Sequence, residues 1–411
     1  IKARPANGAA GKIIVGGNDA AGLSAIYAGA TVCAWYPITP STSVAEAFEG
    51  YLKRMRKDKD GKLLGAIVQA EDELAAIGVV LGAVWNGSRA FTATSGPGIS
   101  LMSEFLGLAY VAELPVVLFN IQRGGPSTGM PTRTQQSDIL SCAYASHGDT
   151  KHVLLLPEDP HESFEFAAQS FDLAERLQTP VFVLLDLDIG MNDWLTKPFA
   201  WDDKKAYDRG KVMTAEQLEA GKEFGRYLDV DGDAIPYRTL PGTHPTKGAY
   251  FTRGTSRNRY AKYSEEGADY VDNMQRLLRK FETAKKLVPQ PIVRKAAKKT
   301  RFGAIYYGST SPAMNEAIEL LLADGVDLDI LRVRGFPFPA DVERFIDEHE
   351  TVFVVEQNRD AQLRTLLVNE LERPIAKLVP VLHYDGTPIT ARFIAREIGD
   401  RIKGANVEPL K

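Results

Sequence analysis

Residues 36–42 combine hydroxyl side chains with two prolines at the end of an apolar run, directly before a predicted helix. The prolines fix much of the local backbone, and the unsatisfied N–H groups of a helix N-terminus attract anions. The segment could therefore hold a negatively charged ligand. Taken alone, a stiff loop followed by a capped helix is the simpler interpretation.

Residues 69–73 place three carboxyl groups, those of Glu71, Asp72 and Glu73, where an apolar run meets a long apolar helix. The helix dipole favours negative charge at a helix start. That is a sufficient structural explanation, so this segment alone predicts no chemistry.

Two further segments, residues 94–98 and 122–129, are rich in glycine and also follow apolar runs. Glycine lets a backbone approach a ligand closely, and the guanidinium of Arg123 can donate two parallel hydrogen bonds to a carboxylate. The nearest acid in sequence, Glu113, lies at the other end of the preceding run. Burying a guanidinium without a partner of opposite charge is costly in free energy. We therefore expect a bound anion to pair with the guanidinium of Arg123. The alternative is an ion pair with a distant acid such as Asp138.

The elements that must position these loops alternate between short apolar runs and amphipathic stretches. We predict strands at residues 12–15, 30–35, 65–70, 88–94, 114–122, 153–156 and 181–188, and helices at residues 20–29, 43–57, 71–85 and 160–177. Such alternation predicts an α/β domain over residues 12–195, with a parallel sheet and helices on both faces. Ligands of such folds collect at the carboxyl ends of the strands. All four loops should therefore lie at one edge of the sheet.

Residues 196–300 differ, because they are polar and contain no strong strand pattern. We expect one long helix there, at residues 263–287, followed by a basic stretch at residues 294–301. A nucleic-acid arm could use such a stretch, but it lacks interleaved aromatic residues, so a solvated helix and linker is preferred. Residues 301–401 return to the α/β pattern and predict a second, smaller domain.

Composition narrows the class of protein. The 411 residues carry a formal net charge of −4, which gives no general attraction to nucleic acid or to anionic lipid. No apolar run approaches the length of a membrane span, and the first residues lack the pattern of a signal peptide. With only two cysteines and no Cys-x-x-Cys, the chain is expected to hold no metal and no iron–sulfur cluster of the usual kind. A cytoplasmic protein is the expectation.

Together, these segments resemble the alpha subunit of 2-oxoacid:ferredoxin oxidoreductases, in particular the 2-oxoglutarate branch. Residues 36–41 (YPITPS), 69–71, 94–98 and 122–127 match motifs of that family. Residues 244–256 and 334–339 are typical of the branch. The resemblance covers essentially the whole chain, and the combination is far more specific than any one string.

The resemblance implies a pyrimidine-binding thiamine diphosphate domain over residues 12–195 and a transketolase C-terminal-like domain over residues 301–401. Glu71 would hydrogen-bond N1′ of the aminopyrimidine, which requires a partly desolvated carboxyl group. Thr39 and Arg123 would bind the 2-oxoacid, with Tyr36 nearby. The other positions assigned to the cofactor are Pro37, Ile38, Ser95 and Gly96.

The family's diphosphate and magnesium motif is absent from this chain, as are the cluster cysteines. In split members of the family both belong to a beta subunit. The resemblance therefore implies a partner chain with magnesium and a [4Fe-4S] cluster, electron transfer to ferredoxin, acyl transfer to coenzyme A, and a dimer of alpha–beta units. Many alpha subunits of the branch also carry an N-terminal gamma-type domain, which we expect to be separate, removed or outside this sequence.

Two other functions compete with this interpretation: the pyrimidine-side subunit of another thiamine diphosphate enzyme, and a noncatalytic assembly subunit. Within the favoured family, 2-oxoglutarate is indicated by the branch alone. Its distal carboxylate requires a second cation or hydroxyl cluster, for which Arg133, Lys247 and Arg253 are the candidates. Oxidation or reductive carboxylation would be decided by the ferredoxin potential.

Overall fold

The computed structural model describes residues 7–404, and its largest sheet has seven strands in the order β12-β6-β7-β5-β4-β2-β3. Every pairing in this sheet is parallel except that of β12 with β6. The strands are β2 (Val32–Trp35), β3 (Ala66–Gln69), β4 (Ala90–Thr94), β5 (Val117–Gln122), β6 (Val153–Leu155), β7 (Val181–Asp186) and β12 (Gly335–Phe336). The predicted parallel α/β sheet is confirmed.

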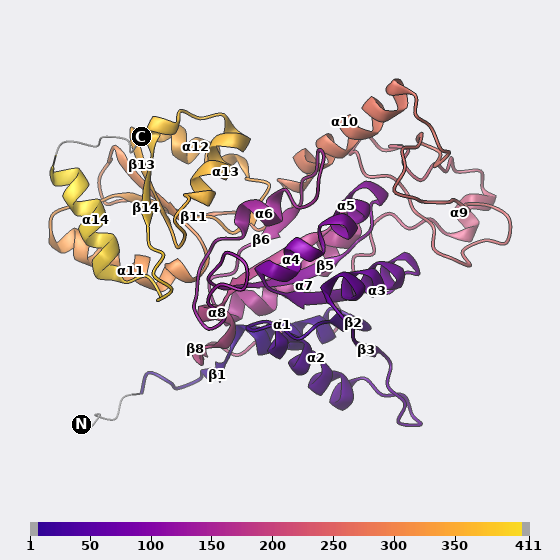
Figure 1. Ribbon diagram of the computed structural model, residues 1–411, viewed down its shortest axis with the longest axis horizontal. Coiled ribbons are helices and arrows are strands. Elements are labelled where there is room, and N and C mark those ends of the chain that lie inside the picture. Colours follow the sequence, from indigo (N-terminus) through magenta and orange to yellow (C-terminus); the bar gives the residue numbers. More distant parts are fainter. Residues whose placement is uncertain (1–6, 405–411) are drawn as a thin grey trace.

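Helices cover both faces of this sheet (Figure 1). One apolar core lies beneath α1 (Gly17–Tyr27), α2 (Thr42–Met55) and α7 (Pro160–Leu177). A second core lies beneath α3 (Glu73–Trp85), α4 (Gly96–Leu101), α5 (Ser103–Ala112) and α6 (Ile139–Ala143). The bounds of α7 match the prediction, since Asp159 caps the helix by accepting a hydrogen bond from the backbone N–H of Glu162, and Pro160 opens its first turn.

Several predicted elements extended beyond the observed ones, and at two of them an aspartate that caps a helix sets the boundary. The strand predicted at residues 181–188 ends at Asp186, whose side chain accepts a hydrogen bond from Ile189 and starts α8 (Leu187–Met191). Asp72 likewise accepts from the backbone N–H of Ala75, so α3 begins at Glu73. The first strand, β1 (Ile13–Val15), forms, but it pairs with β8 (Trp194–Thr196) outside the main sheet.

The segment after β8 runs across the first unit and contains α9 (Ala215–Glu219) and α10 (Gly267–Ala284). A buried ion cluster fastens α10. Arg276 and Lys280 donate to the carboxylate of Glu113, at distances of 2.6 Å and 2.9 Å. Burial alone would raise the pKa of Glu113, but the two cations outweigh burial and hold the pKa well below its ordinary value. The helix is thereby fixed to the end of α5.

The C-terminal unit is a second, smaller α/β domain, as predicted. Its sheet has the order β14-β13-β10-β11-β9, with only β9 antiparallel. The strands are β9 (Ile292–Arg294), β10 (Phe302–Tyr306), β11 (Asp329–Arg332), β13 (Thr351–Glu356) and β14 (Leu378–Leu382). The helices are α11 (Ser311–Ala323), α12 (Ala340–Glu348), α13 (Gln362–Leu371) and α14 (Ala391–Lys403), with 3₁₀ turns at Gly308–Thr310 and Ile375–Lys377. Because β9 lies within the segment expected to be a linker, the division of the chain at residue 301 stays a prediction.

The two units share structure at their junction. Strand β12 leaves the C-terminal unit and pairs with β6, so it completes the sheet of the first unit. Arg332 and Arg334 donate to the carboxylate of Glu162 at the start of α7. Residues 334–339, singled out by resemblance, therefore lie where the units join.

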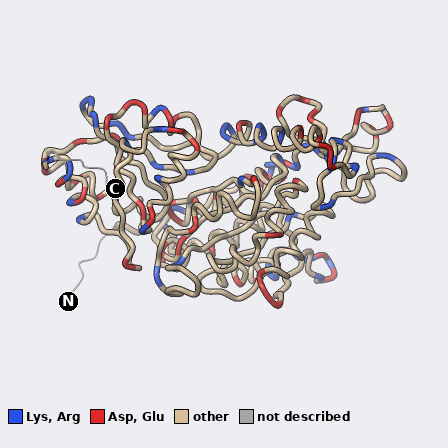
Figure 2. The backbone as a smooth tube through the Cα atoms, turned by 45° about the horizontal axis from the view of Figure 1, so that its top comes forward, with Lys and Arg blue, Asp and Glu red and all other residues tan. Residues whose placement is uncertain are grey.

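Charged residues of both signs are mixed along the outer helices and loops, while the central strands are mostly uncharged (Figure 2). Among residues 7–404, the helices are too short or too polar to cross a membrane.

We expect Glu113→Gln to lower the free energy of unfolding by roughly 3–5 kcal/mol, because Arg276 and Lys280 would lose their counter-charge inside the protein. Glu282→Gln is the matched control, since its ion pair with Lys285 is exposed and should contribute under about 1 kcal/mol. Chemical denaturation followed by tryptophan fluorescence measures both. Equal effects of the two substitutions would contradict the assigned role.

Candidate functional site

The loops that follow β2, β3, β4 and β5 lie at one edge of the seven-stranded sheet, because these strands are parallel and share their carboxyl ends. One hydrogen bond joins two of these loops directly. The Nη1 atom of Arg123, just after β5, donates to the backbone carbonyl of Thr39, after β2, over 2.6 Å. The structure therefore brings together two of the residues assigned to the 2-oxoacid.

The loop after β2 uses two of its hydroxyl groups internally. Ser41 donates from its Oγ to the carbonyl of Ile38, and the Oγ1 of Thr42 accepts from the backbone N–H of Ile38. These groups close the turn, so they are not free to hold an anion as the sequence suggested. The side chain of Thr39 remains exposed, as do those of Tyr36 and Pro37.

Asn18 holds the same loop from the side of α1. Its Nδ2 donates to the carbonyl of Pro40 and to the Oγ of Ser43, both over 2.8 Å, and its side chain is buried. Sequence reasoning missed this residue. The carbonyls of Thr39 and Pro40 are thus held by two donors from different elements, Arg123 after β5 and Asn18 on α1.

Arg123 is 7% exposed, and its Nε is buried without a hydrogen-bond partner. Burial lowers the pKa of its guanidinium, while the charges of Asp138 and Glu73 act in the opposite direction. Within the described part of the chain, no carboxylate oxygen lies within the 4.0 Å of an ion pair with Arg123. The alternative of a direct ion pair with Asp138 is therefore not formed, and the Nε of the guanidinium is left without a partner.

The three neighbouring acids occupy different surroundings. Glu71 is exposed, Asp72 caps α3, and Glu73 is 5% exposed. Glu73 lies against the turn after β4, where a Cβ on Gly98 would be 2.8 Å from its Cγ and 1.9 Å from the Oγ1 of Thr94. That crowding explains the glycine. In this chain by itself, the desolvated carboxyl group is Glu73, and Glu71 would need cover from another chain.

The turn after β4 adds further unpaired groups. The Oγ of Ser95 is fully buried without a partner, as is the Oδ1 of Asn120 on β5. Gly96 lies against Asp138, because a Cβ there would be 3.0 Å from the Oδ1 of that carboxylate. Buried polar atoms normally have partners. Those of Ser95, Asn120 and Arg123 gather at one edge and fit a polar cofactor or substrate.

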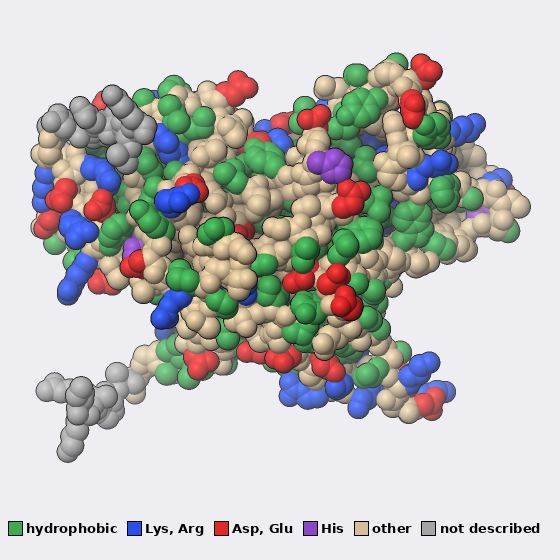
Figure 3. Space-filling view, in the orientation of Figure 1, with side chains coloured by type: hydrophobic (Ala, Val, Ile, Leu, Met, Phe, Trp, Pro, Cys, Tyr) green, Lys and Arg blue, Asp and Glu red, His purple; other side chains and the backbone are tan. Residues whose placement is uncertain are grey.

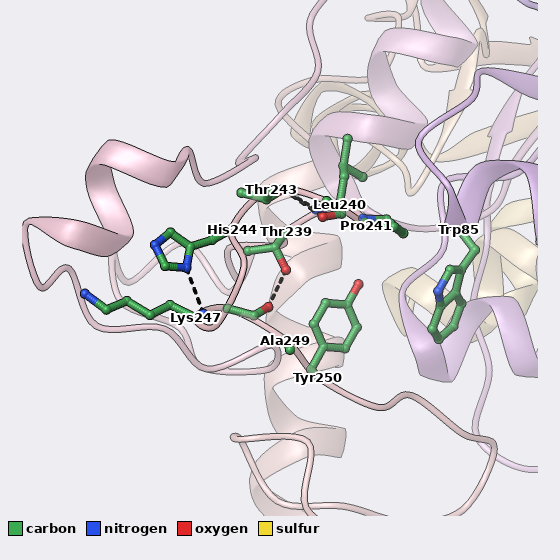
Figure 4. A pocket seen from close by; sticks show the side chains of 11 residues that line it. Trp85, Thr239, Leu240, Pro241, Thr243, His244, Lys247, Ala249 and Tyr250 are labelled. Carbon is green, nitrogen blue, oxygen red and sulfur yellow. Dashed lines mark hydrogen bonds between the residues drawn. The ribbon is translucent and has the colours of Figure 1, made fainter.

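A separate pocket of about 180 Å³ lies in the connecting segment (Figure 4). It is lined by Trp85 and by residues 239–244 and 247–250. Trp85 ends α3, whereas Glu73 begins it, and a helix of this length spans about 20 Å. This pocket therefore lies at the opposite edge of the sheet from Arg123.

The position of this pocket bears on which of Arg133, Lys247 and Arg253 could bind the distal carboxylate of a substrate such as 2-oxoglutarate. Lys247 belongs to this remote pocket and pairs with Glu219 over 2.8 Å. Arg253, in the same segment, lies over the ring of Phe251. Arg133 alone of the three lies on the loop after β5, where its carbonyl accepts from the backbone N–H of Gly124.

Comparison with known proteins decides the family. The family model described as the thiamine diphosphate-binding region of pyruvate flavodoxin/ferredoxin oxidoreductase matches residues 24–278. The 2-oxoglutarate synthase subunit KorA of Archaeoglobus fulgidus is 32% identical over 381 residues, which are 92% of this chain and 95% of that protein. The chain belongs to the 2-oxoacid:ferredoxin oxidoreductase family.

Other members of the family are longer. Subunit alpha of 2-oxoacid:ferredoxin oxidoreductase 2 from Aeropyrum pernix is 36% identical over 86% of this chain and 56% of that protein. The chain thus spans little more than half the length of that relative. A solved structure of the 2-oxoglutarate:ferredoxin oxidoreductase from Magnetococcus marinus, with 2-oxoglutarate, coenzyme A and succinyl-CoA bound, matches with a TM-score of 0.85 and 31% identity, over 95% of this chain and 65% of that one.

A split-gene transketolase matches at 12% identity, with a TM-score of 0.53 over 95% of this chain and 98% of that one. At this identity the likeness shows the fold alone. It agrees with a thiamine diphosphate-type α/β unit followed by a second α/β unit. Within residues 7–404, there is no group of three His, Cys, Asp or Glu side chains that could hold a metal ion.

We expect Asn18→Ala to loosen the loop after β2, because the carbonyl of Pro40 and the hydroxyl of Ser43 would lose their donor. A lost buried hydrogen bond costs about 1–3 kcal/mol. Hydrogen exchange should therefore speed up in residues 36–43 while the central strands stay protected. Asn86→Ala is the control, since Asn86 is exposed and donates only to Gly82 within α3 and its cap. Unchanged exchange in Asn18→Ala would contradict the assigned role.

Proposed function

We propose that this chain is the alpha subunit of a 2-oxoacid:ferredoxin oxidoreductase that converts 2-oxoglutarate and coenzyme A to succinyl-CoA. Electrons would pass to ferredoxin, and the reaction could also run in reverse. The observation that carries the proposal is the buried guanidinium of Arg123, which holds Thr39 and keeps an unpartnered Nε at the carboxyl edge of the sheet. Relatives named 2-oxoglutarate synthase support the choice of substrate.

The site residues keep the roles that the resemblance gives them. Arg123 binds the carboxylate of the 2-oxoacid, beside the exposed hydroxyl of Thr39, with Tyr36 at the entrance. Arg133, on the loop after β5, is our candidate for the distal carboxylate of 2-oxoglutarate. Residues that line the thiamine diphosphate site are Pro37, Ile38, Ser95 and Gly96.

Thiamine diphosphate, when bound, supplies the electron sink for decarboxylation. This chain contributes a carboxyl group that shares a proton with N1′ of the aminopyrimidine, and Glu71 is the residue proposed for it. Its side chain is exposed here, so this role requires a partner chain that removes water from it. Glu73, which is already buried two residues along, is the alternative.

The surface around Glu71 supports such a partner. Strand β3 is the edge strand of the sheet, so one side of it has no neighbour. Large apolar side chains are exposed just before β3 and on the helices α3 and α4: Leu64 at 53%, Leu74 at 40% and Leu101 at 55%. Groups of hydrophobic side chains also reach the surface on the face seen in Figure 3. An exposed apolar patch beside an open strand edge is typical of an interface. We assign this face to a beta subunit that carries the diphosphate site, magnesium and a [4Fe-4S] cluster, within a dimer of alpha–beta units.

Co-expression with the partner chain tests the function. The purified complex should reduce a viologen dye with 2-oxoglutarate and coenzyme A, more efficiently than with pyruvate or a branched 2-oxoacid, and should show the brown absorbance of an iron–sulfur cluster. The isolated chain, with two buried free cysteines, should be colourless and inactive. A colourless complex without dye reduction would favour an assembly subunit or another thiamine diphosphate enzyme.

Matched substitutions in that complex can distinguish the roles of Glu71 and Glu73. We expect Glu71→Gln to slow turnover by about 10²–10⁴-fold while leaving the fold intact, because a general acid–base contribution is of that size. Glu73→Gln is made beside it, and Glu104→Gln, an exposed acid on α5, serves as control. Exchange of the C2 proton of bound thiamine diphosphate is the measurement. Wild-type exchange in Glu71→Gln together with slow exchange in Glu73→Gln would move the role to Glu73.

A further inference from the structure

The loop after β5, residues 123–138, carries both arginines assigned to the 2-oxoacid and is closed on itself. The backbone N–H of Gly124 donates to the carbonyl of Arg133 over 2.9 Å, and the backbone N–H of Met130 donates to the carbonyl of Gly124 over 2.7 Å. The residue that follows Arg123 is therefore held against Arg133. A shift of this loop would move both arginines together.

Gln136, near the end of the same loop, is fully buried and bonds to the C-terminal unit through every polar group that it has. Its backbone N–H donates to the carbonyl of Gln357 over 2.8 Å, and its Nε2 donates to the carbonyl of Tyr307 over 3.1 Å. Its Oε1 accepts from the backbone N–H of Gln357 and from the hydroxyl of Thr310. Its carbonyl accepts from the hydroxyl of Tyr307 and from the Nδ2 of Asn358. The segments that follow β10 and β13 thereby clasp the loop after β5.

The surroundings of Gln136 leave it little freedom to move. A Cβ on Gly308 would lie 3.0 Å from its Nε2. The hydrogen bonds also continue into the first unit, because the Nε2 of Gln357 donates to the Oγ of Ser309 over 2.9 Å, and that hydroxyl donates to the carboxylate of Asp186 at the end of β7. Buried polar groups whose bonds are all satisfied favour one arrangement. The loop therefore has a defined position relative to both sheets.

Gly386, on the segment after β14, is a second contact between the C-terminal unit and this loop. A Cβ there would be 2.8 Å from the Cε of Met130 and 3.1 Å from the Cβ of Arg133. The glycine is buried, although its neighbours Asp385 and Thr387 are exposed. Its φ of +85° is also one that residues with a side chain rarely adopt. Arg133 is thus packed directly on the C-terminal unit.

We propose that the C-terminal unit positions the loop that binds the 2-oxoacid, and that it does so through Gln136 and Gly386. This inference rests on the proposed function, in which Arg123 and Arg133 bind the two ends of the substrate. Gln136 fixes the loop as a whole and therefore acts on Arg123, whereas Gly386 fixes the place of Arg133. Both are positioning residues, because they act through the arginines. The C-terminal unit thereby takes part in selecting a dicarboxylic 2-oxoacid over a monocarboxylic one.

Hydrogen exchange in the co-expressed alpha–beta complex tests the clasp. Gln136→Ala removes the bonds of the side chain, so the hydrogen-bonded amides of residues 124–133 should exchange about 5–150-fold faster, the factor that one lost buried hydrogen bond gives. Gln169→Ala is the matched control, since that glutamine also joins two parts of the chain, by donating to the carbonyl of Leu287 over 3.3 Å. It should leave these amides unchanged. Unchanged exchange in Gln136→Ala would overturn the proposal.

Substrate selectivity tests the second contact. Gly386→Ala places a methyl group against Arg133, so kcat/KM for 2-oxoglutarate should fall about 3–10-fold relative to kcat/KM for 2-oxobutyrate, which lacks the distal carboxylate. The fall should come through KM, with kcat little changed. Gly325→Ala is the control, because Gly325 has a similar φ of +76° in the same unit but nothing within 4 Å of an added Cβ. An equal fall for both substrates in Gly386→Ala would make Gly386 structural and overturn the proposal.

A double-mutant cycle identifies the residue on which Gly386 acts. In an Arg133→Ala background, Gly386→Ala should change the ratio of the two kcat/KM values by less than about twofold. A change that persists without the guanidinium of Arg133 would overturn the proposal. Gly386→Ala removes none of the bonds of Gln136, so it also serves as the second variant if Gln136→Ala does not fold.

Hydrogen exchange needs no turnover, and it therefore separates this inference from the proposed function. If the complex turns over no 2-oxoacid, the proposed activity fails. The exchange of residues 124–133 in Gln136→Ala then still decides whether the C-terminal unit holds the loop: faster exchange supports that role, and exchange as in the wild type overturns it.

Discussion

The site depends on one constraint, the parallel alignment of β2, β4, β5 and β7. Parallel strands need crossover helices, and those helices return each strand in the same direction. All their carboxyl ends therefore meet at one edge, and residues distant in sequence become neighbours there. The bond between Arg123 and the carbonyl of Thr39 joins positions 84 residues apart. Without the shared direction of the strands, Arg123 would not reach the loop after β2, and the acids that follow β3 would lie away from it.

The sequence predicted the elements well where local signals and tertiary packing agree. Helix α7 has an aspartate cap, a proline in its first turn and an apolar face, and its bounds were predicted correctly. Two of the ends that were predicted too long carry an aspartate inside an apolar or acidic run, Asp186 and Asp72. At these two positions the element boundary is set by a helix cap, and the hydrogen bond that makes the cap can be identified only in the structure. Residues 334–339 were recognised as distinctive, but their pairing with β6 was not, because a two-strand contact across the chain leaves no local periodicity.

The site was predicted in outline more than in detail. Arginine after a strand and glycines after its neighbour indicated a ligand edge, and the structure joins Arg123 to Thr39. Burial, by contrast, cannot be read from three adjacent acids, and only the fold shows that Glu73 is enclosed while Glu71 is exposed. Asn18 escaped notice for a related reason. Its importance comes from the carbonyl of Pro40 that it faces, and that contact is decided by the packing of α1 against the loop after β2.

Strand β12 has a consequence for how this chain can be divided. Because the seven-stranded sheet takes its last strand from residues 335–336, the first unit is not complete at residue 300. A chain cut there would leave β6 with open backbone donors and acceptors, and Glu162 without its two arginines. Exposed strand edges pair with one another. Truncated forms of this protein should therefore self-associate into aggregates, and attempts to express the first unit by itself are better served by keeping residues 330–339 attached.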